Sequence, residues 1–263
     1  MAPVGLSQSG AADRGAWRLA NRLVGNPPGC AAIEVTLGGF AAVVQANPLI
    51  AVTGAEGPVE LAGRAVDRNA VVFWPQGVRL DCRMPSAGSR SYLAVRGGWA
   101  GDPVLGSVSW HALARVRPPP LAAGNVLEVG EDTAYVPVVG HVAVAPPGNH
   151  VELAATWGPR ADWLTDEARR RLRAMPWRVT DRLDRTGVRL AGEDLRWQSP
   201  GAELASEGVV RGAIQVPPSG QPILFLADHP ATGGYPVVAV VSSVAADRAA
   251  QLRPGDEVRL SLP

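Results

Sequence analysis

The stretch from Ser206 to Val241 holds the densest set of polar side chains that could carry out chemistry. They interrupt segments that are otherwise apolar, and they are Glu207, Arg211, Gln215, Gln221, Asp228 and His229. Polar groups within buried strands need hydrogen-bond partners or a ligand. We interpret the stretch as a pocket in which Asp228 and Glu207 act as acid, base or cation ligand. Arg211 would bind a carboxylate or carbonate, and Gly233 and Gly234 would let the backbone approach the ligand closely.

A purely structural interpretation of the same residues stays open. In this interpretation residues 233–236, Gly-Gly-Tyr-Pro, form a tight turn, Arg211 pairs with Glu207, and Asp228 caps the turn through Thr232. A dyad of Asp228 and His229 is disfavoured, because neighbouring side chains of a strand point to opposite faces of a sheet.

Ser9 and Asp13 form a second polar group near the start of the chain. We expect Ser9 to cap a helix over residues 11–24, with Asp13 in its first turn. Apolar residues recur on one face of that helix, and Gly25 follows it. Neither Gly5-Leu6-Ser7 nor Ser9-Gly10 completes the Gly-x-Ser-x-Gly turn of a serine hydrolase, so this type of nucleophilic catalysis has little support.

Several reaction classes are excluded by composition. All 25 basic residues are arginine, so a P-loop lysine, a Schiff-base lysine and a biotinyl-lysine cannot occur in this chain. The two cysteines and four histidines lack the spacings of zinc sites, and we predict no metal. A net charge of +1 favours neither nucleic acid nor an anionic membrane as partner. Cysteines beside apolar runs and an N-terminus unlike a signal peptide indicate a reduced, cytoplasmic setting.

The elements that must position these residues are mainly β-strands. Glycine and proline turns separate short apolar or alternating runs at residues 31–37, 41–46, 49–53, 71–74, 92–95, 126–129, 141–145, 187–190, 223–226, 237–241 and 257–260. Further short helices are predicted over residues 163–175, where Thr165 precedes two acids and Pro176 ends the pattern, and over residues 244–252. This pattern is typical of a β-sandwich or β-barrel.

A weak internal repeat favours two similar β units. Residues 121–129 match residues 252–260 at an offset of 131, and Tyr92-Leu93-Ala94 matches Phe225-Leu226-Ala227 at 133. The turn at Pro146-Pro147-Gly148 marks the expected boundary. We therefore predict a first unit over residues 1–147 and a second over residues 148–263.

Ordered motifs along nearly the whole chain resemble one family. They are Ser9-Gly10-Ala11-x-Asp13, residues 19–26, Tyr92-Leu93-Ala94-Val95 with Gly97-Gly98, residues 104–107, Ser206-Glu207-Gly208-Val209-Val210 with residues 212–218, and Thr232-Gly233-Gly234-Tyr235-Pro236. These motifs are similar to those of the family of 5-oxoprolinase C subunits. That family is also called allophanate hydrolase subunit 2, or the biotin-dependent carboxyltransferase domain family, and it includes the antagonist of a sporulation-kinase inhibitor.

The resemblance implies a fold, an activity and partners. The fold would be mainly β, with two cyclophilin-like β-barrel units and a few short helices, and the second unit would carry the SEGVV and TGGYP motifs. The activity would be ATP-dependent opening of 5-oxoproline to glutamate, with homologues of the 5-oxoprolinase B and A subunits as partners. A partner would bind the nucleotide or help to bind it, and no biotin would be attached to this chain.

Family position and the polar residues of the strands together select the candidate site. Asp228 and Glu207 are the predicted catalytic residues. The predicted substrate-binding residues are Arg211, Gln215, Thr232, Gly233, Gly234, Tyr235, Ser9 and Asp13.

The chain departs from the family pattern at two places. Members usually read Asp-x-Gln-Thr-Thr-Gly-Gly-Tyr-Pro-Lys, whereas here Val237 replaces the lysine and the glutamine is also missing. Members also begin with one more strand and a Gln-Asp-x-Gly-Arg segment. Either Met1 is not the natural start, or the first barrel unit lacks its N-terminal strand and exposes an edge to a partner.

These departures keep two further functions open beside the 5-oxoprolinase component. One is a non-catalytic regulatory protein that binds a B-type partner. The other is a carboxyltransferase component that moves a carboxyl group from biotin to urea, with the biotin on a separate carrier.

Overall fold

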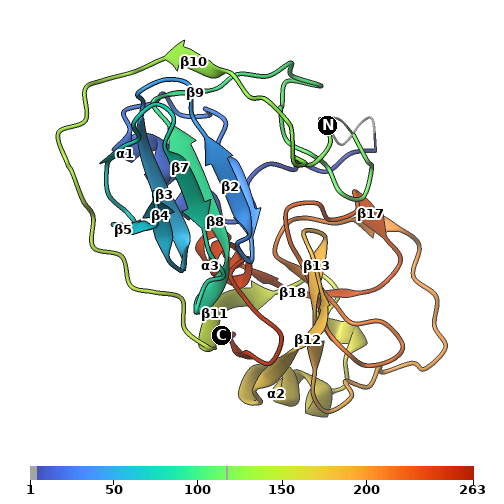
Figure 1. Cartoon of the computed structure of the whole chain (residues 1–263). Coiled ribbons are helices and arrows are strands. Elements are labelled where there is room, and N and C mark those ends of the chain that lie inside the picture. Colours follow the sequence, from blue (N-terminus) through green and yellow to red (C-terminus); the bar gives the residue numbers. More distant parts are fainter. Residues whose placement is uncertain (1–4, 117) are drawn as a thin grey trace. The chain divides into compact units, whose positions relative to one another are not determined.

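The computed structural model describes residues 5–116 and 118–263, which divide into two compact units (Figure 1). The C-terminal unit comprises residues 5–12, 111–116 and 148–263, and the N-terminal unit comprises residues 13–110 and 118–147. The chain passes between units for the last time at Pro147 and Gly148, where the sequence predicts a boundary. Residues 5–12 and 111–116, however, pack with the C-terminal unit.

A closed barrel of seven strands forms the centre of the C-terminal unit. Its strands run in the order β11-β18-β15-β16-β13-β12-β19. The pair β11 and β19 is parallel, and the other neighbours are antiparallel. The bounds are β11 His150–Trp157, β12 Trp177–Leu183, β13 Gly187–Ala191, β15 Ala213–Gln215, β16 Ile223–Phe225, β18 Val237–Val241 and β19 Glu257–Ser261.

Alternating side chains fill this barrel. In β11, Leu153 and Ala155 are buried, whereas Glu152, Ala154 and Thr156 between and beside them are exposed. Two helices cover the barrel core, α2 over Asp166–Ala174 and α3 over Ser243–Ala249, and both contribute buried residues to it. A short 3-10 turn spans Ala161–Trp163, and a two-stranded ribbon joins β14, Glu207–Gly208, to β17, Thr232–Gly233.

The N-terminal unit contains two four-stranded antiparallel sheets, with strand orders β1-β8-β3-β6 and β2-β7-β4-β5. A core that includes Trp74, Leu80 and Leu93 is buried there. The bounds are α1 Arg14–Leu23, β1 Ile33–Thr36, β2 Phe40–Val43, β3 Leu49–Glu56, β4 Val59–Leu61, β5 Arg64–Val66, β6 Val72–Phe73, β7 Arg79–Cys82, β8 Ala87–Val95, β9 Gly97–Trp99 and β10 Val129–Asp132.

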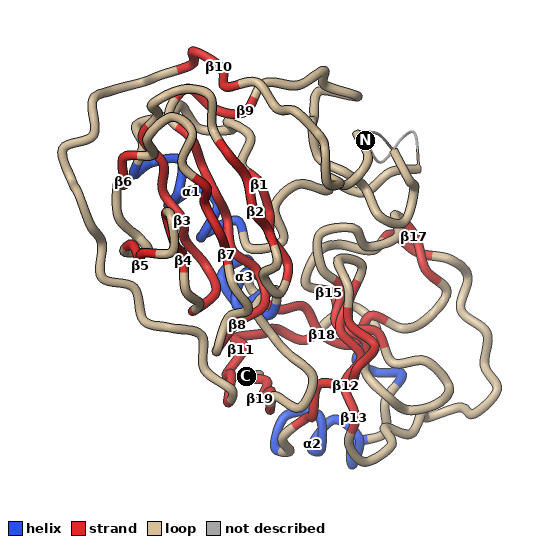
Figure 2. The backbone as a smooth tube through the Cα atoms, viewed as in Figure 1, coloured by secondary structure: helices blue, strands red, loops and turns tan. Residues whose placement is uncertain are grey.

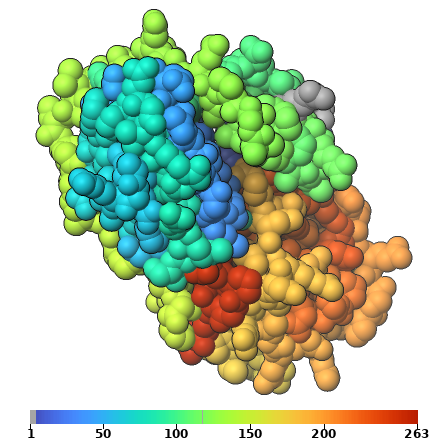
Figure 3. All heavy atoms as spheres, viewed as in Figure 1, coloured from blue at the N-terminus to red at the C-terminus, as the bar shows by residue number. Residues whose placement is uncertain are grey.

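A long segment, residues 118–147, crosses the outside of the N-terminal unit, and we call it the strap. Apart from β10, which pairs with β9, it consists of loops and turns (Figure 2). Backbone hydrogen bonds attach it to the unit, from Ala134 N–H to the Gly25 carbonyl and from Val142 N–H to the Asn69 carbonyl. Its yellow-green atoms lie at the outer edge of the cyan strands in Figure 3.

The mainly β fold with short helices is confirmed, and the described residues contain one closed barrel. Helix α2 has Thr165 as its N-cap and ends before Pro176, as the sequence predicts. The strands predicted at residues 126–129 and 141–145 are wrong. Only Val129 of the first lies in a strand, and only His141 of the second makes an isolated bridge. Residues 121–128 are therefore loop whereas β19 is a strand, so this half of the proposed repeat has no structural counterpart.

Among the described residues, no helix combines the length and apolar character that crossing a bilayer requires.

The barrel core predicts the effect of one substitution. Leu153→Ala removes a fully buried side chain from β11, so we expect the free energy of unfolding to fall by about 2–5 kcal/mol. The neighbouring Glu152→Ala, on an exposed position of the same strand, should change it by less than about 0.5 kcal/mol. Urea unfolding of both variants measures this, and equal effects would contradict the burial pattern.

Candidate functional site

Glu207 lies in the ribbon of β14 and β17, where it faces Gly233 across the ladder. Its carboxylate forms a two-pronged ion pair with Arg160, whose Nε donates to Oε1 at 3.0 Å and to Oε2 at 3.1 Å. The Nη2 of Arg160 also donates to Oε1. The backbone N–H of Arg160 donates to the carbonyl of Val237 in β18. The barrel therefore fixes the position of the Arg160 backbone.

The ion pair controls the charge of Glu207. Hydrogen bonding to the Arg160 guanidinium lowers the pKa of the Glu207 carboxyl below its ordinary value. The side chains of Glu207 and Arg160 are 31% and 39% exposed, so a ligand can reach both. A carboxylate of low pKa is a weak base, and it is better suited to accept hydrogen bonds or to stabilise positive charge.

Gln215 lies beside the ribbon in the barrel wall and is buried. Its Nε2 donates to the Tyr235 carbonyl at 2.8 Å, and its Oε1 makes no hydrogen bond within the described residues. A side chain at Gly233 would place its Cβ 2.9 Å from Nε2 of Gln215, so only glycine lets the amide lie here. We call Arg160, Glu207, Gln215, Thr232, Gly233 and Tyr235 the Glu207 site.

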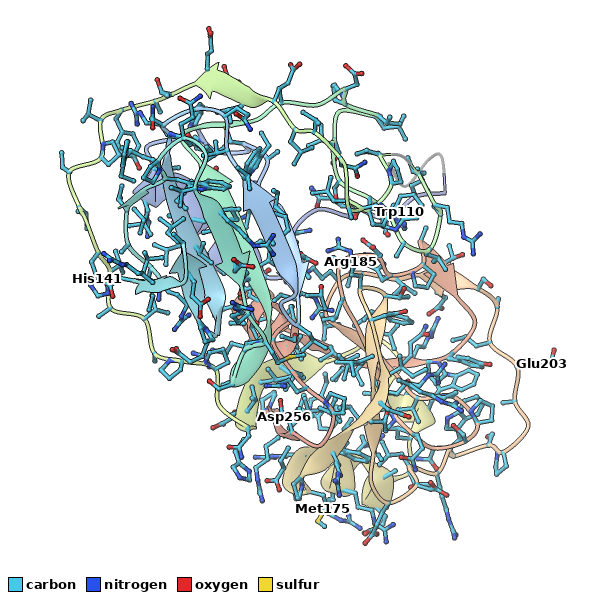
Figure 4. The ribbon with its side chains drawn as sticks, in the orientation of Figure 1. Trp110, His141, Met175, Arg185, Glu203 and Asp256 are labelled. Carbon is cyan, nitrogen blue, oxygen red and sulfur yellow. The ribbon has the colours of Figure 1, made fainter. Side chains whose placement is uncertain are left out.

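Asp228 has a different environment, because it is completely buried. Its Oδ1 accepts hydrogen bonds from Ser9 Oγ at 2.5 Å and from Arg185 Nη2 at 3.2 Å. Its Oδ2 accepts from Arg185 Nε and from the Ala112 backbone N–H, both at 2.9 Å. Arg185 projects from the turn between β12 and β13 (Figure 4), and its Nη2 also donates to the Gly10 carbonyl.

The Asp228 cluster, Ser9, Gly10, Ala112, Arg185 and Asp228, joins three stretches of the C-terminal unit. The carboxylate holds residues 5–12, residues 111–116 and the barrel loops together, and four donors already use its oxygens. A carboxylate with these four hydrogen bonds is better suited to hold the three stretches in place than to transfer a proton. It also differs from the cap through Thr232 that the structural interpretation expected.

His111 and Ser7 lie in the same stretches, both buried, with Nε2 and Oγ 3.0 Å apart. The Nδ1 of His111 accepts from the Ala114 N–H at 3.2 Å, so the ring proton of a neutral imidazole is on Nε2. Nε2–H then donates to Ser7 Oγ. In this tautomer the imidazole cannot accept the serine proton, so the pair is not a nucleophile and base.

Arg211 pairs with Asp247 rather than with Glu207. Its Nη2 donates to Asp247 Oδ1 at 2.6 Å and to the Ala12 carbonyl at 2.7 Å, while its Nε is buried without a hydrogen bond. The expected ion pair between Arg211 and Glu207 is therefore wrong. Glu207 forms its ion pair with Arg160, and Arg211 forms its ion pair with Asp247 of α3.

Asp13 belongs to the N-terminal unit and is the N-cap of α1, where it accepts from the Ala16 N–H at 2.9 Å. The predicted cap at Ser9 is wrong, since α1 begins at Arg14. The Asp13 N–H also donates to the hydroxyl of buried Tyr92, and burial raises the pKa of Tyr92 well above its ordinary value.

The structure thus divides the predicted site residues among several places. Glu207, Gln215, Thr232, Gly233 and Tyr235 gather at the Glu207 site, and Gly234 follows in the same loop. Ser9 and Asp228 form the Asp228 cluster, whereas Arg211 and Asp13 make separate structural contacts. Sequence reasoning missed Arg160 and Arg185, because nothing in their spacing distinguishes them from the other arginines of the chain.

No group of three or more His, Cys, Asp or Glu side chains gathers in a way that could hold a metal ion within the described part of the chain.

Comparison with known proteins identifies the class of this chain. The sequence profile of the family described as carboxyltransferase domain, subdomain A and B, matches residues 4–262. The chain therefore belongs to this family, which confirms the resemblance found in its motifs. Its fold also matches the crystal structure of TTHA0988, with a TM-score of 0.87 and 36% identity. That match covers 98% of this chain but 51% of TTHA0988, so the chain spans about half of that protein.

Within the family, curated relatives are more particular. The chain is 33% identical over 240 residues to the C subunit of 5-oxoprolinase from Escherichia coli strain K12, a match that covers 90% of this chain and 76% of that protein. It is also 29% identical to the urea amidolyase of Lachancea kluyveri over 97% of this chain, but this is 15% of that protein.

The ion pair of Glu207 predicts a titration result. Arg160→Gln removes the guanidinium, so the pKa of the Glu207 carboxyl should rise toward the ordinary value of about 4.3. Arg211→Gln should leave the pKa unchanged, because Arg211 pairs with Asp247. Carboxyl NMR over a pH series measures both variants, and a shift only in Arg211→Gln would contradict the assigned partner.

The Asp228 cluster predicts a coupled loss of stability. Asp228→Asn leaves Arg185 without its buried counter-charge, so the free energy of unfolding should fall by about 3 kcal/mol. The double variant Asp228→Asn/Arg185→Met should lose much less free energy of unfolding than the sum of the losses in the two single variants. Asp181→Asn, an exposed aspartate in β12, is the control and should be nearly neutral. Additive effects in urea unfolding would show that the pair is not coupled.

Proposed function

We propose that this chain is the C-type component of a heteromeric, ATP-dependent 5-oxoprolinase that converts 5-oxoproline to glutamate. The observation that carries the proposal is the 33% identity with the 5-oxoprolinase C subunit of Escherichia coli across most of both chains. The urea amidolyase match covers a much smaller part of its relative.

The reaction opens a lactam. Water adds across the amide bond, its hydroxyl going to the carbonyl carbon and its proton to the nitrogen that is released. The new products are a carboxylate and an ammonium group. A site for this reaction needs an acceptor for the lactam N–H, a cation for the substrate carboxylate, and negative charge near the nitrogen that becomes protonated.

The Glu207 site offers these groups on partly exposed elements. Gln215 Oε1 accepts the lactam N–H, because Nε2 of the same amide is already held by the Tyr235 carbonyl. Arg160 directs its remaining donors to the substrate carboxylate while Glu207 fixes its guanidinium. The ionised Glu207 stabilises the ammonium group as it forms. Thr232 and Gly233 border the substrate from β17.

Asp228, predicted as a catalytic residue, acts in this proposal as a positioning residue. Its buried carboxylate holds Ser9 and Ala112 against the barrel. Arg211 likewise supports the fold through Asp247 and the Ala12 carbonyl, rather than binding substrate.

The nucleotide and the partners belong to the same proposal. This chain has no lysine and no Walker A pattern, so we place ATP on or with a partner chain. The partners are homologues of the 5-oxoprolinase B and A subunits, which we call the B-type and A-type partners. The two cysteines, Cys30 and Cys82, are free thiols, which supports a cytoplasmic location.

A second function is favoured by the family description and by the urea amidolyase match. In this alternative the chain contributes to carboxyl transfer from biotin to urea. The biotin would be on a separate carrier, because no lysine is available here for its attachment. Dependence of activity on a biotinylated carrier and urea, without stimulation by 5-oxoproline, would select this alternative.

Activity of the assembled complex tests the proposal. We expect 5-oxoproline to stimulate ATP hydrolysis by this chain mixed with the A-type and B-type partners of the same genome. Glu207→Gln should reduce the stimulated rate by about 100-fold, because it removes the charge but keeps the shape. Glu203→Gln, an exposed acid four residues earlier (Figure 4), is the matched control and should retain the rate.

Two outcomes would contradict this assignment. No stimulation by 5-oxoproline in a complex that assembles would favour the non-catalytic regulatory protein, consistent with Val237 in place of the family lysine. Stimulation that survives Glu207→Gln would place the chemistry outside the Glu207 site.

A further inference from the structure

The second half of the strap is apolar, uncharged and exposed. Residues 133–147 contain no Asp, Glu, Lys or Arg. Val136 and Val138 are 74% and 91% exposed, and Tyr135, Val139 and Val144 are exposed as well. Single exposed apolar side chains are ordinary, but a contiguous group of them marks a surface that another molecule covers.

The strap is attached to the sheet around His141 and separates from it at residues 143–145. Ala70 and His141 form an antiparallel bridge, and hydrogen bonds link Val71 N–H to the Gly140 carbonyl and Val142 N–H to the Asn69 carbonyl. Residues 143–145 make no hydrogen bond within the described part of the chain. His141, at the attachment point, is labelled in Figure 4.

A groove of about 820 Å³ lies where residues 141–145 of the strap separate from the sheet. Residues 141–145 of the strap line it together with residues 56–59 and 65–69 of the same unit. β5 is an edge strand of its sheet, so one side of its backbone has no strand partner among the described residues. The groove is therefore bordered by two segments whose backbone groups can pair with an added extended chain.

Asn69 supplies an unused acceptor at this groove. Its side chain is buried, and its Oδ1 has no hydrogen-bond partner within the described residues. Its backbone has a φ of 53°, a conformation that asparagine and glycine tolerate better than other residues. An unpaired buried acceptor is costly, and a local shift that uncovers Oδ1 to an N–H donor of an added chain would remove that cost.

We propose that this groove and the exposed valines of the strap form the docking surface for the B-type partner, which adds an extended segment beside β5. The proposal rests on the proposed function for the existence of that partner. TTHA0988 supports it, because half of that chain corresponds to this protein and the other half is additional polypeptide in the same molecule. A second polypeptide of that size is large enough to cover the uncharged strap.

Binding of the B-type partner from the same genome tests the surface. The double variant Val136→Asp/Val138→Asp places two charges on side chains that do not support the fold, and it should weaken the complex at least about tenfold. The control is Val244→Asp, a 64% exposed valine in α3 of the other unit, which should bind as the unmodified chain does. Asn69→Gly keeps the backbone conformation while removing Oδ1, and it should also weaken binding. Calorimetric titration gives the affinities, and light scattering gives the masses.

Each outcome decides the proposal. Loss of binding in the strap variant and in Asn69→Gly, with binding retained by Val244→Asp, supports it. Unchanged affinity of the strap variant overturns the surface and leaves the proposed function intact. Absence of a complex with the unmodified chain overturns both the surface and the partner part of the proposed function. A dimer of this chain alone that the strap variant dissociates also overturns the proposal, because the strap would then join two copies.

Discussion

One buried carboxylate holds the C-terminal unit in its observed form. Asp228 is inaccessible to solvent, and such a charge is tolerated only when it is neutralised and fully hydrogen-bonded. Arg185, Ser9 and Ala112 meet this requirement from three stretches that are far apart in the sequence. The requirement is mutual, because Arg185 also needs its counter-charge. Residues 5–12 and 111–116 are thereby fixed to the barrel, although they are not strands of it.

The loop that carries Asp228 also leads into the Glu207 site. Residues 228–236 run from the buried ion pair to β17 and on to the Tyr235 carbonyl that holds Gln215. The two acids of this region therefore differ in environment, one buried and saturated, the other partly exposed and paired with Arg160. In the proposed function this difference in environment gives Asp228 a structural role and Glu207 a chemical one. Gly233 lies in this loop, and a larger residue there would collide with the Gln215 amide.

Local signals in the sequence were sufficient for the helices and for much of the β structure. Thr165, the acids after it and Pro176 define α2 because capping and termination depend on neighbouring residues. The sequence predicts Ser9 as the cap of α1, but Asp13 and Ser9 are both good caps, and in the structure Asp228 binds the serine hydroxyl while Asp13 caps the helix. The valines of residues 141–145 suggest a strand, but strand formation requires a partner, and here only His141 has one.

The site was only partly predictable for a related reason. Motifs and the family resemblance identified Glu207, Gln215 and Gly233, which lie in or beside short strands. The ion pairs could not be assigned, because 25 arginines offer many partners and the choice depends on contacts 36 to 47 residues apart. Arg211, Asp228 and Glu207 lie near one another in sequence, yet each of them pairs with a group outside their common stretch.

The parallel pairing of β11 with β19 has a consequence for how this unit forms. These are the first and last strands of the barrel, and their register from His150 with Glu257 to Ala154 with Ser261 closes it. During synthesis, the wall of the barrel therefore stays open until the last strand has left the ribosome. Contacts between such distant residues form slowly, and unpaired edges attract other chains in the meantime. Until β19 is made, β11 and β12 each lack one neighbouring strand, so both have an edge that can pair wrongly.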